Sequence, residues 1–272
     1  MRKKDLVKLD GISETLLITL YVRARESKRL DAMIKDENAV EMVGLIDRDF
    51  SRLRLPRRDE VAIIMRMRKF DNHVRDFLMR NPDAIVVHIG CGLDTRFERV
   101  TNNRVEWFDL DIPNVIDLRK KFIPNESSHY HTLAASVFDD DWIKTVSQFN
   151  PHPFMFVAEG ALPYFEETQV KILFFKLRDN FPGCELVCDA HTPFVNWIDN
   201  LHLKFTGVEA RLQWSIEKGN DPESWGEGIR LLDEWNYYED DEPRLKVFQW
   251  VRLFPVIAKS SGIFHYKLGF TS

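Results

Sequence analysis

The sequence contains few cysteines, and Cys91, Cys184 and Cys188 are the only three among 272 residues. An odd number without regular spacing provides neither a disulfide framework nor a cysteine metal site, so we expect reduced thiols and a cytoplasmic protein. Long apolar runs are also missing, because no hydrophobic stretch reaches 18 residues and none follows the charged N-terminus. The sequence therefore predicts neither a membrane-spanning helix nor a secretory leader, and we expect no membrane partner.

An excess of positive charge is missing as well. The chain has 38 Lys and Arg residues against 43 Asp and Glu residues, which gives a formal net charge of −5. Because nonspecific nucleic-acid binding needs a basic surface, we expect no nucleic-acid partner. The chain also lacks internal repeats and Gly/Ser-rich linkers, whereas hydrophobic residues make up 44% of it. We therefore expect a single domain over residues 1–272 with a substantial apolar core.

Several motifs of known catalytic mechanism do not occur. The sequence has no HExxH motif and no Cys/His cluster, so we expect no metal site. It has no GxSxG motif, which argues against the nucleophile elbow of the α/β-hydrolases. It also lacks the Gly-Lys-Ser/Thr sequence of a P-loop. Metal-dependent hydrolysis, a serine nucleophile and P-loop chemistry are therefore unsupported.

The pattern of apolar residues changes at about residue 80. Residues 1–80 have few turn formers and place apolar residues at helical spacing, which predicts a helical N-terminal cap. Between residues 81 and 190, apolar runs alternate with helical patterns. We expect strands near 84–89, 105–110, 129–133, 153–158 and 185–188, and helices near 95–101, 113–122, 140–148 and 166–180. This alternation predicts an α/β fold with a parallel sheet and right-handed crossovers.

The alternation stops within residues 191–226. Helices inserted after the fifth strand are suggested there by six apolar side chains, namely Phe194, Trp197, Ile198, Leu201, Leu203 and Phe205. Such an insertion at the ligand edge of a sheet forms either a lid or substrate-pocket wall, or additional core packing. Residues 227–272 are expected to form a strand near 229–236, a helix near 243–257 and a last strand near 262–269.

A glycine turn follows the first predicted strand. Apolar residues 85–87 lead into Gly90-Cys91-Gly92, and such a turn at a strand end is where open α/β sheets bind nucleotides. The dinucleotide fingerprint requires a third glycine, and Leu93-Asp94 stand in its place. The turn therefore favours a ligand without a phosphate there, such as S-adenosylmethionine. A purely structural turn is the alternative for a glycine pair alone.

Carboxylates follow the second and fourth predicted strands. Asp109 and Asp111 share one face of a strand, and Asp111 lies about 20 residues beyond the glycines, where a carboxylate can bind ribose hydroxyls. A helix N-cap is the alternative role for Asp111. Glu159 directly follows the strand near 153–158 and precedes Gly160. It is placed either to meet a sulfonium or amino group or to form a simple turn.

Four further side chains are candidates for the site. Arg66 lies in an otherwise apolar helix before the sheet, and its guanidinium suits bidentate binding of a carboxylate, with a solvated face as the alternative. His88 and His191 are expected at strand ends, where a lone histidine is more often structural than catalytic. His191 and Tyr164 are the nearest candidates for a general base, and neither is convincing.

Motifs from about residue 11 to residue 269 together resemble one enzyme family. Its N-terminal signatures are similar to GISETLLITLYVRARESKR (11–29), KDENAVEMV (35–43) and RMRKFDNHVRDFL (66–78). Its glycine motif and its second and fourth strands are similar to VVHIGCGLDTRFERV (86–100), VEWFDLDIPNVIDLRKKFI (105–123) and FVAEGALPYF (156–165). The chain thus resembles the leucine carboxyl methyltransferase-like enzymes, especially their bacterial tetracenomycin polyketide O-methyltransferase-like branch.

The resemblance implies a fold and a cofactor. The fold is a Rossmann-like class I methyltransferase with a seven-stranded, mostly parallel sheet, an antiparallel last strand and a helical N-terminal cap. The cofactor is S-adenosyl-L-methionine as methyl donor. By matching position, Arg66 would hold the methionyl carboxylate, and Gly90, with Cys91 and Gly92, would pass beneath the cofactor. Asp111 would take the ribose hydroxyls.

The same resemblance implies the remaining contacts. Glu159 would lie near the methionine moiety. The family often places an acidic residue against adenine after the third strand, where this chain offers Ser136 and Val137, with Asp139 further on. The residue that contacts adenine therefore stays open. Asp109 also departs from the family, which usually has glutamate there.

The implied function is O-methylation of a carboxylate or hydroxyl on a small molecule, a polyketide or another metabolite. Methyl transfer from a sulfonium is an in-line displacement, so the protein mainly supplies orientation. A carboxylate needs no general base, whereas a phenol, with a pKa of about 10, benefits from one. Because no convincing base is present, we favour carboxyl methylation.

Other functions remain open at this point. One is a scaffold protein that binds S-adenosylmethionine without catalysis, and another is a protein carboxyl methyltransferase. The chain has no obvious peptide-docking module, which favours a small-molecule acceptor over a protein. A nicotinamide-dependent oxidoreductase is disfavoured by the missing third glycine.

Overall fold

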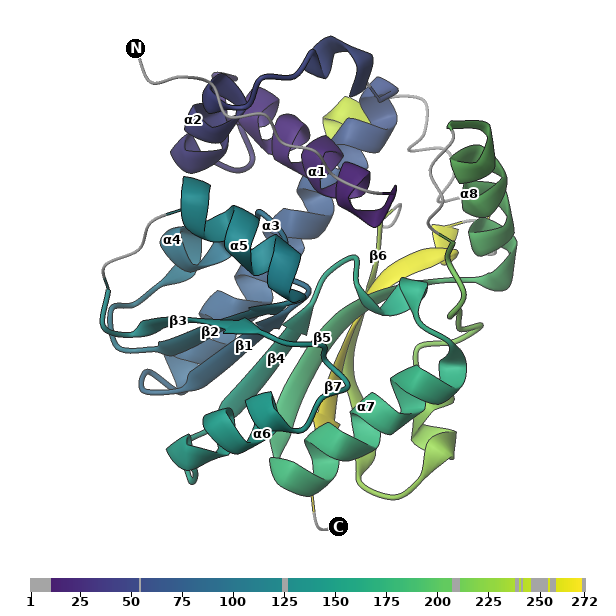
Figure 1. Ribbon diagram of the computed structural model, residues 1–272. Helices are drawn as coiled ribbons and strands as arrows, with labels where there is room; N and C mark the ends of the chain where they lie inside the picture. Colours follow the sequence, from purple (N-terminus) through teal and green to yellow (C-terminus); the bar gives the residue numbers. More distant parts are fainter. Residues whose placement is uncertain are drawn as a thin grey trace.

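Helices cover both faces of a seven-stranded sheet in the computed structural model (Figure 1). The structure describes residues 11–53, 55–123, 127–206, 211–237, 240, 242–245, 254 and 258–270. The strands are β1 (Ile85–Ile89), β2 (Glu106–Asp111), β3 (Tyr130–Ala134), β4 (Phe154–Ala158), β5 (Cys184–His191), β6 (Ile229–Asn236) and β7 (Ser261–Leu268). The α-helices are α1 (Gly11–Ser27), α2 (Glu37–Leu45), α3 (Arg57–Arg80), α4 (Arg96–Val100), α5 (Pro113–Phe122), α6 (Asp141–Val146), α7 (Glu167–Asn180) and α8 (Pro193–Thr206).

The strand order β3-β2-β1-β4-β5-β7-β6 fixes where a ligand can enter the sheet. β1 to β5 are parallel, and β7 is antiparallel to both of its neighbours, as the sequence motifs predicted. The chain moves outward from β1 to β3 and then returns to place β4 on the other side of β1. At such a switch point the connections leave β1 and β4 in opposite directions, which opens a crevice at their carboxyl ends.

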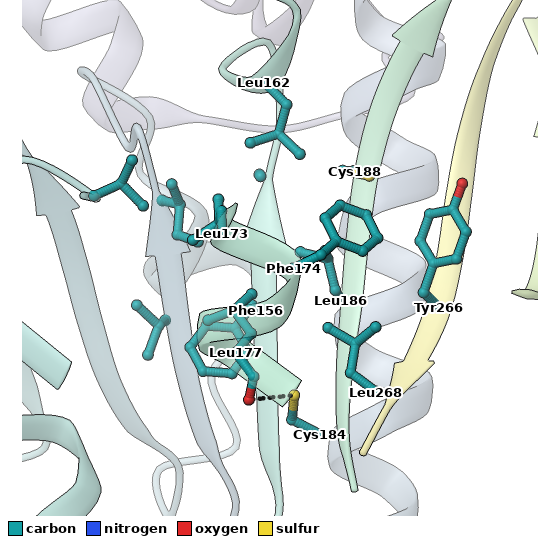
Figure 2. Packing of buried hydrophobic residues seen from close by; sticks show 14 of the residues in the cluster. Phe156, Leu162, Leu173, Phe174, Leu177, Cys184, Leu186, Cys188, Tyr266 and Leu268 are labelled. Atoms are coloured by element: carbon teal, nitrogen blue, oxygen red, sulfur yellow. Dashed lines mark hydrogen bonds between the residues drawn. The ribbon is translucent and has the colours of Figure 1, made fainter. Parts of the chain in front are cut away.

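One face of the sheet packs against α6 and α7 in an extensive apolar core (Figure 1). Figure 2 shows Leu173, Phe174 and Leu177 of α7 beside side chains of β4, β5 and β7. The Cys184 thiol donates to the Leu177 carbonyl at 3.8 Å. Like Cys184, the other two cysteines of the chain are buried and unpaired. The cytoplasmic location that the cysteine content favours stays a prediction.

The opposite face packs against α3 and α4. Phe70, Val74 and Phe77 lie on one stripe of α3, because they follow each other at helical spacing, and they pack on Val86 and Val157 of the sheet. The same stripe reaches Arg66 one turn earlier. This placement brings a guanidinium to the carboxyl edge of the strands.

The helical cap predicted for residues 1–80 is present as α1 to α3 within the described part of the chain. Leu17 and Leu20 of α1 share an apolar cluster with Met42 of α2 and with Leu93, which follows the glycine turn. α1 therefore lies against the first strand-to-helix connection of the sheet.

The segment 191–226 differs in part from the prediction of several helices. It contains one α-helix, α8, and a 3₁₀ helix at Asp221–Trp225, apart from residues 207–210, which the structure does not describe. Four side chains of α8 are 42–62% exposed and so do not pack in the core, namely Phe194, Trp197, Ile198 and Leu201. Trp214 and Ile216, later in the same segment, are buried in the main core cluster. The role of the segment as a lid stays a prediction.

Two further predictions from the sequence concern a helix near the C-terminus and membrane-spanning helices. The helix expected near 243–257 lies mostly outside the described residues. In the described segments, no helix has the length and apolar character needed to cross a bilayer.

A buried carboxylate at the start of β5 predicts how the free energy of unfolding depends on pH. Glu185 pairs with Arg80, with N–O distances of 3.0 and 2.9 Å, and with His265 at 2.9 Å. Burial alone would raise the pKa of Glu185, but its two partners outweigh burial and lower this pKa from 4.5 to about 2. A carboxyl group with a lowered folded-state pKa stabilises the fold above its unfolded-state pKa, and this stability is lost as the pH falls through the folded-state value.

We therefore expect the free energy of unfolding to fall between pH 4.5 and about 2, and to fall less steeply in Glu185→Gln. Urea denaturation at a series of pH values measures the slope. Glu167→Gln, at an exposed position of α7, is the matched control and should keep the wild-type slope. An unchanged slope in Glu185→Gln would contradict the prediction.

Candidate active site

A cavity of about 740 Å³ lies at the carboxyl edge of the sheet, beneath the helical cap. Its wall combines residues of α1 and α3, the turns after β1 and β4, the end of β5, and Asp199 of α8. This volume is within the range of sites for cofactors and small molecules. The crevice predicted from the topology is therefore a real cavity, and α8 contributes to its wall.

The cavity brings together most of the residues that the sequence singled out. Its wall includes Arg66, Gly90, Cys91, Gly92, Glu159, Tyr164 and His191. Asp111, Ser136 and Val137 lie outside this wall, at the ends of the adjacent strands β2 and β3. The cavity thus covers the carboxyl ends of β1, β4 and β5. Asp111, Ser136 and Val137 line the neighbouring sheet edge, at the carboxyl ends of β2 and β3.

Both glycines of the turn have a left-handed backbone, and Gly90 is also required by close packing. Gly90 has a φ of +65°, and a Cβ added to it would lie 2.8 Å from Cβ of Ala161 in the turn after β4. Gly92 has a φ of +52°, and its near neighbour is the end of the flexible Leu16 side chain in α1, 2.6 Å from an added Cβ. The backbone conformation therefore favours glycine at both positions, and at Gly90 the close approach of the β4 connection excludes a side chain as well.

The two aspartates of β2 have different surroundings. Asp111 accepts hydrogen bonds from the backbone N–H groups of Gly92 at 2.9 Å and Ile112 at 2.8 Å, and burial raises its pKa. Asp109 is almost fully buried, forms an ion pair with Arg119, and accepts from the Tyr130 hydroxyl at 2.5 Å. Asp109 is therefore a structural anchor, and Asp111 is the carboxylate at the edge.

The alternative N-cap role of Asp111 is not observed. The N-cap residue of α5 is Ile112, and no side chain caps this helix.

The end of β3 is a compact polar turn. A carboxylate oxygen of Asp139 accepts from the Ser136 N–H at 2.9 Å, and the Ser136 hydroxyl accepts from the Phe138 N–H at 3.2 Å. The carbonyl of buried Val137 accepts from the Trp142 indole at 3.1 Å. The Asp139 carboxylate is thus used within its own turn. Ser136 and the backbone of this turn are the groups that lie at the sheet edge beside β2.

Arg66 forms a bridge between the ends of β4 and β5. Its Nε donates to Glu159 at 2.9 Å, and its Nη1 donates to Asp189 at 3.1 Å. Burial would lower the pKa of Arg66, but the charges of Glu159 and Asp189 outweigh burial and raise it. Asp189 also accepts from the Gly160 N–H at 2.7 Å. Asp189 was not among the residues predicted from the sequence, although it directly follows the strand expected near 185–188 and lies within β5.

A second buried arginine joins the glycine turn to the same cluster. Arg96 is fully buried and pairs with Glu159, with Asp71 at 2.9 Å and with Asp94 at 3.2 Å. Burial would lower the pKa of Arg96, but these carboxylates outweigh burial and raise it. No role was predicted for Arg96 from the sequence. Only its position in the motif after the two glycines pointed to this part of the fold.

His88 is held inside this network. Arg96 Nη1 lies 3.1 Å from His88 Nε2, and Asp109 Oδ1 lies 3.4 Å from His88 Nδ1. Because a guanidinium only donates, Nε2 accepts and the ring proton lies on Nδ1, toward the aspartate. His88 therefore has a structural role, in line with the expectation for a lone histidine.

The two candidate bases are poor bases at neutral pH. His191 Nδ1 lies 2.8 Å from the Ser261 hydroxyl, and burial lowers the pKa of His191 to about 4 against the opposing charge of Asp199. Burial also raises the pKa of Tyr164. Across the described ranges, no group of three or more His, Cys, Asp or Glu residues is placed to hold a metal ion.

Comparison with known proteins places the chain in a family. Residues 16–177 match the family described as leucine carboxyl methyltransferase. The chain is 34% identical over 233 residues to the tetracenomycin polyketide synthesis O-methyltransferase TcmP of Streptomyces glaucescens, covering 85% of each protein. It is 28% identical over 274 residues to the S-adenosyl-L-methionine-dependent methyltransferase dpfgK of Gibberella zeae, covering 92% of this chain and 90% of the relative.

Solved structures share the fold at low sequence identity. A duf574 family protein from Streptomyces avermitilis has a TM-score of 0.58 at 11% identity, covering 93% of this chain and 97% of its own. A putative methyltransferase from Thermobifida fusca has a TM-score of 0.56 at 14% identity, covering 92% and 94%. With the family match over 16–177, this chain belongs to the leucine carboxyl methyltransferase family, as its motifs predicted.

Proposed function

We propose that this protein is an S-adenosylmethionine-dependent O-methyltransferase that methylates the carboxylate of a small molecule. Membership of the family and the named activities of two relatives support the methyltransferase part of the proposal. The cavity at the switch point supports it independently, because it joins the glycine turn to Arg66 and Glu159. The carboxylate part rests on one observation, that the two candidate bases in the described cavity wall, His191 and Tyr164, are poor bases.

In this proposal the donor lies across the carboxyl ends of β1 and β4. A guanidinium has five N–H groups, and the ion pairs of Arg66 with Glu159 and Asp189 do not use all of them. Arg66 binds the methionyl carboxylate of the donor with the remaining N–H groups. The backbone of Gly90-Cys91-Gly92 passes beneath the donor, and Glu159 lies near its methionine end. The charge of Glu159 also favours a cationic sulfonium nearby.

The adenosine half of the donor extends toward β2 and β3. Asp111 accepts from the ribose hydroxyls while it keeps its bond to the Gly92 N–H, because a carboxylate has about four acceptor positions. Ser136 and Val137 border the adenine. None of these contacts needs a phosphate-binding glycine, which agrees with the missing third glycine of the turn.

The acceptor is inferred from the pKa values of the candidate bases. Burial lowers the pKa of the conjugate acid of His191 to about 4, far below the phenol pKa of about 10, so His191 is poorly suited to remove a phenol proton. A carboxylate is already ionised and attacks the methyl group directly. The new O–CH₃ bond forms as the S–CH₃ bond breaks, and the electron pair of that bond stays on sulfur.

The proposal is tested with a methyl-labelled donor and matched pairs of aromatic acids and phenols, such as 2-naphthoic acid and 2-naphthol. We expect transfer to carboxylates and not to the matched phenols. Transfer to a phenol that is lost in His191→Asn would contradict the carboxylate assignment. Titration with S-adenosylmethionine is the independent measurement, and the absence of binding would exclude both donor and enzyme.

A further inference from the structure

Asp189, near the carboxyl end of β5, is a buried carboxylate with no role in the methyl transfer itself. Asp189 has no exposed surface, lines the cavity, and points to the same face of the sheet as α3. On neighbouring β4, the alternating residue that emerges on this face is Glu159. Two carboxylates thus stand side by side at the carboxyl ends of adjacent parallel strands.

The contacts of Asp189 join two parts of the site. Its Oδ1 accepts from the Gly160 N–H at 2.7 Å, and its Oδ2 accepts from Arg66 Nη1 at 3.1 Å. Gly160 has a φ of +64°, and a Cβ there would lie 3.5 Å from Arg66 Nη2. The guanidinium therefore lies against the Gly160 turn, and one carboxylate fixes both.

The other partners of Arg66 do not make Asp189 redundant. Glu159 accepts from Nε of Arg66 through one carboxylate oxygen, and its other oxygen pairs with Arg96. The buried side chain of Tyr237 also lies near Arg66, whose charge acts on the pKa of the Tyr237 hydroxyl. Asp189 provides the second charged contact, on a different nitrogen, and two contacts on different atoms fix the plane of a guanidinium.

We propose that Asp189 is a positioning residue for the methionine end of the donor. It orients Arg66 so that the remaining N–H groups face the donor carboxylate, and it holds the Gly160 turn that follows Glu159. The proposal rests on the proposed function, because it assumes that the cavity binds S-adenosylmethionine. It predicts that Asp189 strengthens binding of the amino-acid half of the ligand and has no effect on binding of the adenosine half.

Two ligands separate these halves. S-adenosylhomocysteine carries the amino acid, whereas 5′-methylthioadenosine has the same adenosine and thioether without it. Calorimetric titration of the full chain should show that Asp189→Asn binds S-adenosylhomocysteine at least about tenfold more weakly, which corresponds to about 1.4 kcal/mol. Binding of methylthioadenosine should stay within about twofold of the wild type.

Glu185→Gln is the matched control. Glu185 lies four residues earlier on the same strand and also pairs with an arginine, Arg80, but neither lines the cavity. This variant should bind both ligands as the wild type does. Asp189→Glu keeps the charge but displaces it by one methylene. It should therefore also weaken binding of S-adenosylhomocysteine and leave binding of methylthioadenosine unchanged. It replaces Asp189→Asn in the test if Asp189→Asn does not fold.

Two results would overturn the positioning role. Equal loss of both ligands would indicate a general structural role, and unchanged binding of both would indicate no role. Failure of the wild-type chain to bind either ligand would instead overturn the proposed function itself.

Discussion

Replacement of Arg96 by methionine is expected to lower the free energy of unfolding by about 3–5 kcal/mol. The side chain is fully buried and pairs with Asp71, Asp94 and Glu159. Methionine has a similar length, so the packing over the Phe70 ring, now 5.4 Å from the guanidinium carbon, is largely kept. The main loss is electrostatic, because buried carboxylates lose a partner that water cannot replace.

Arg104→Met is the control for this prediction. Arg104 forms a two-pronged pair with Asp83 in which both side chains are 58% exposed. Because exposed ion pairs contribute about 0–1 kcal/mol, this variant should be almost neutral. Urea denaturation at pH 7 followed by circular dichroism compares the two. Similar small losses in both variants would show that the buried network is not a source of stability.

Alanine at Gly90 is expected to have the second large effect. The left-handed backbone conformation costs alanine about 1–2 kcal/mol. The added Cβ would also lie 2.8 Å from Ala161 Cβ, and overpacking adds about 1–3 kcal/mol. The β1 and β4 turns must therefore move apart, and a shift of about 1 Å in a reacting geometry costs roughly a hundredfold in rate. We expect a loss of methyl transfer of that size.

Gly183→Ala separates backbone strain from close approach. Gly183 has a φ of +86°, but no atom lies within 4 Å of an added Cβ. This variant should lose only about 1–2 kcal/mol of stability and keep its methyl transfer. Thermal denaturation and the labelled-donor assay measure both properties. Equal transfer rates in the Gly90 and Gly183 variants would exclude close approach at Gly90 as a requirement of the site.

Local patterns predicted much of the sheet and part of the cavity wall. Short apolar runs between turn formers identified β1 and β4, because a strand buried on both faces needs apolar residues throughout. The edge strand β3 is only partly buried and was expected from its place in the alternation of strands and helices. Gly90 and Gly92 were recognisable because their backbone conformations exclude most other residues. Arg66 and Glu159 were found from their residue types and their positions beside predicted elements, and the family motifs then gave them roles; the structure brings both into one cavity.

Other features depend on contacts between distant segments. Asp189 receives its partners from residues 29 and 123 positions away, and Arg96 pairs with a glutamate 63 positions away. No local pattern distinguishes such a carboxylate from one that faces water. The apolar face of α8 illustrates the reverse case, since its composition suits a core helix but Trp197 is 62% exposed.

The sequence by itself determined the strands, most helices before residue 190, the glycine turn and the family, because these depend on local backbone preferences and on ordered motifs. Only the tertiary structure decided which charges meet. Asp109 and Asp111 are two residues apart, yet one is anchored to Arg119 and the other stays at the ligand edge. The reason is physical: the strength of a charge pair depends on distance and burial, and both are set when the strands, α3 and the cap pack together.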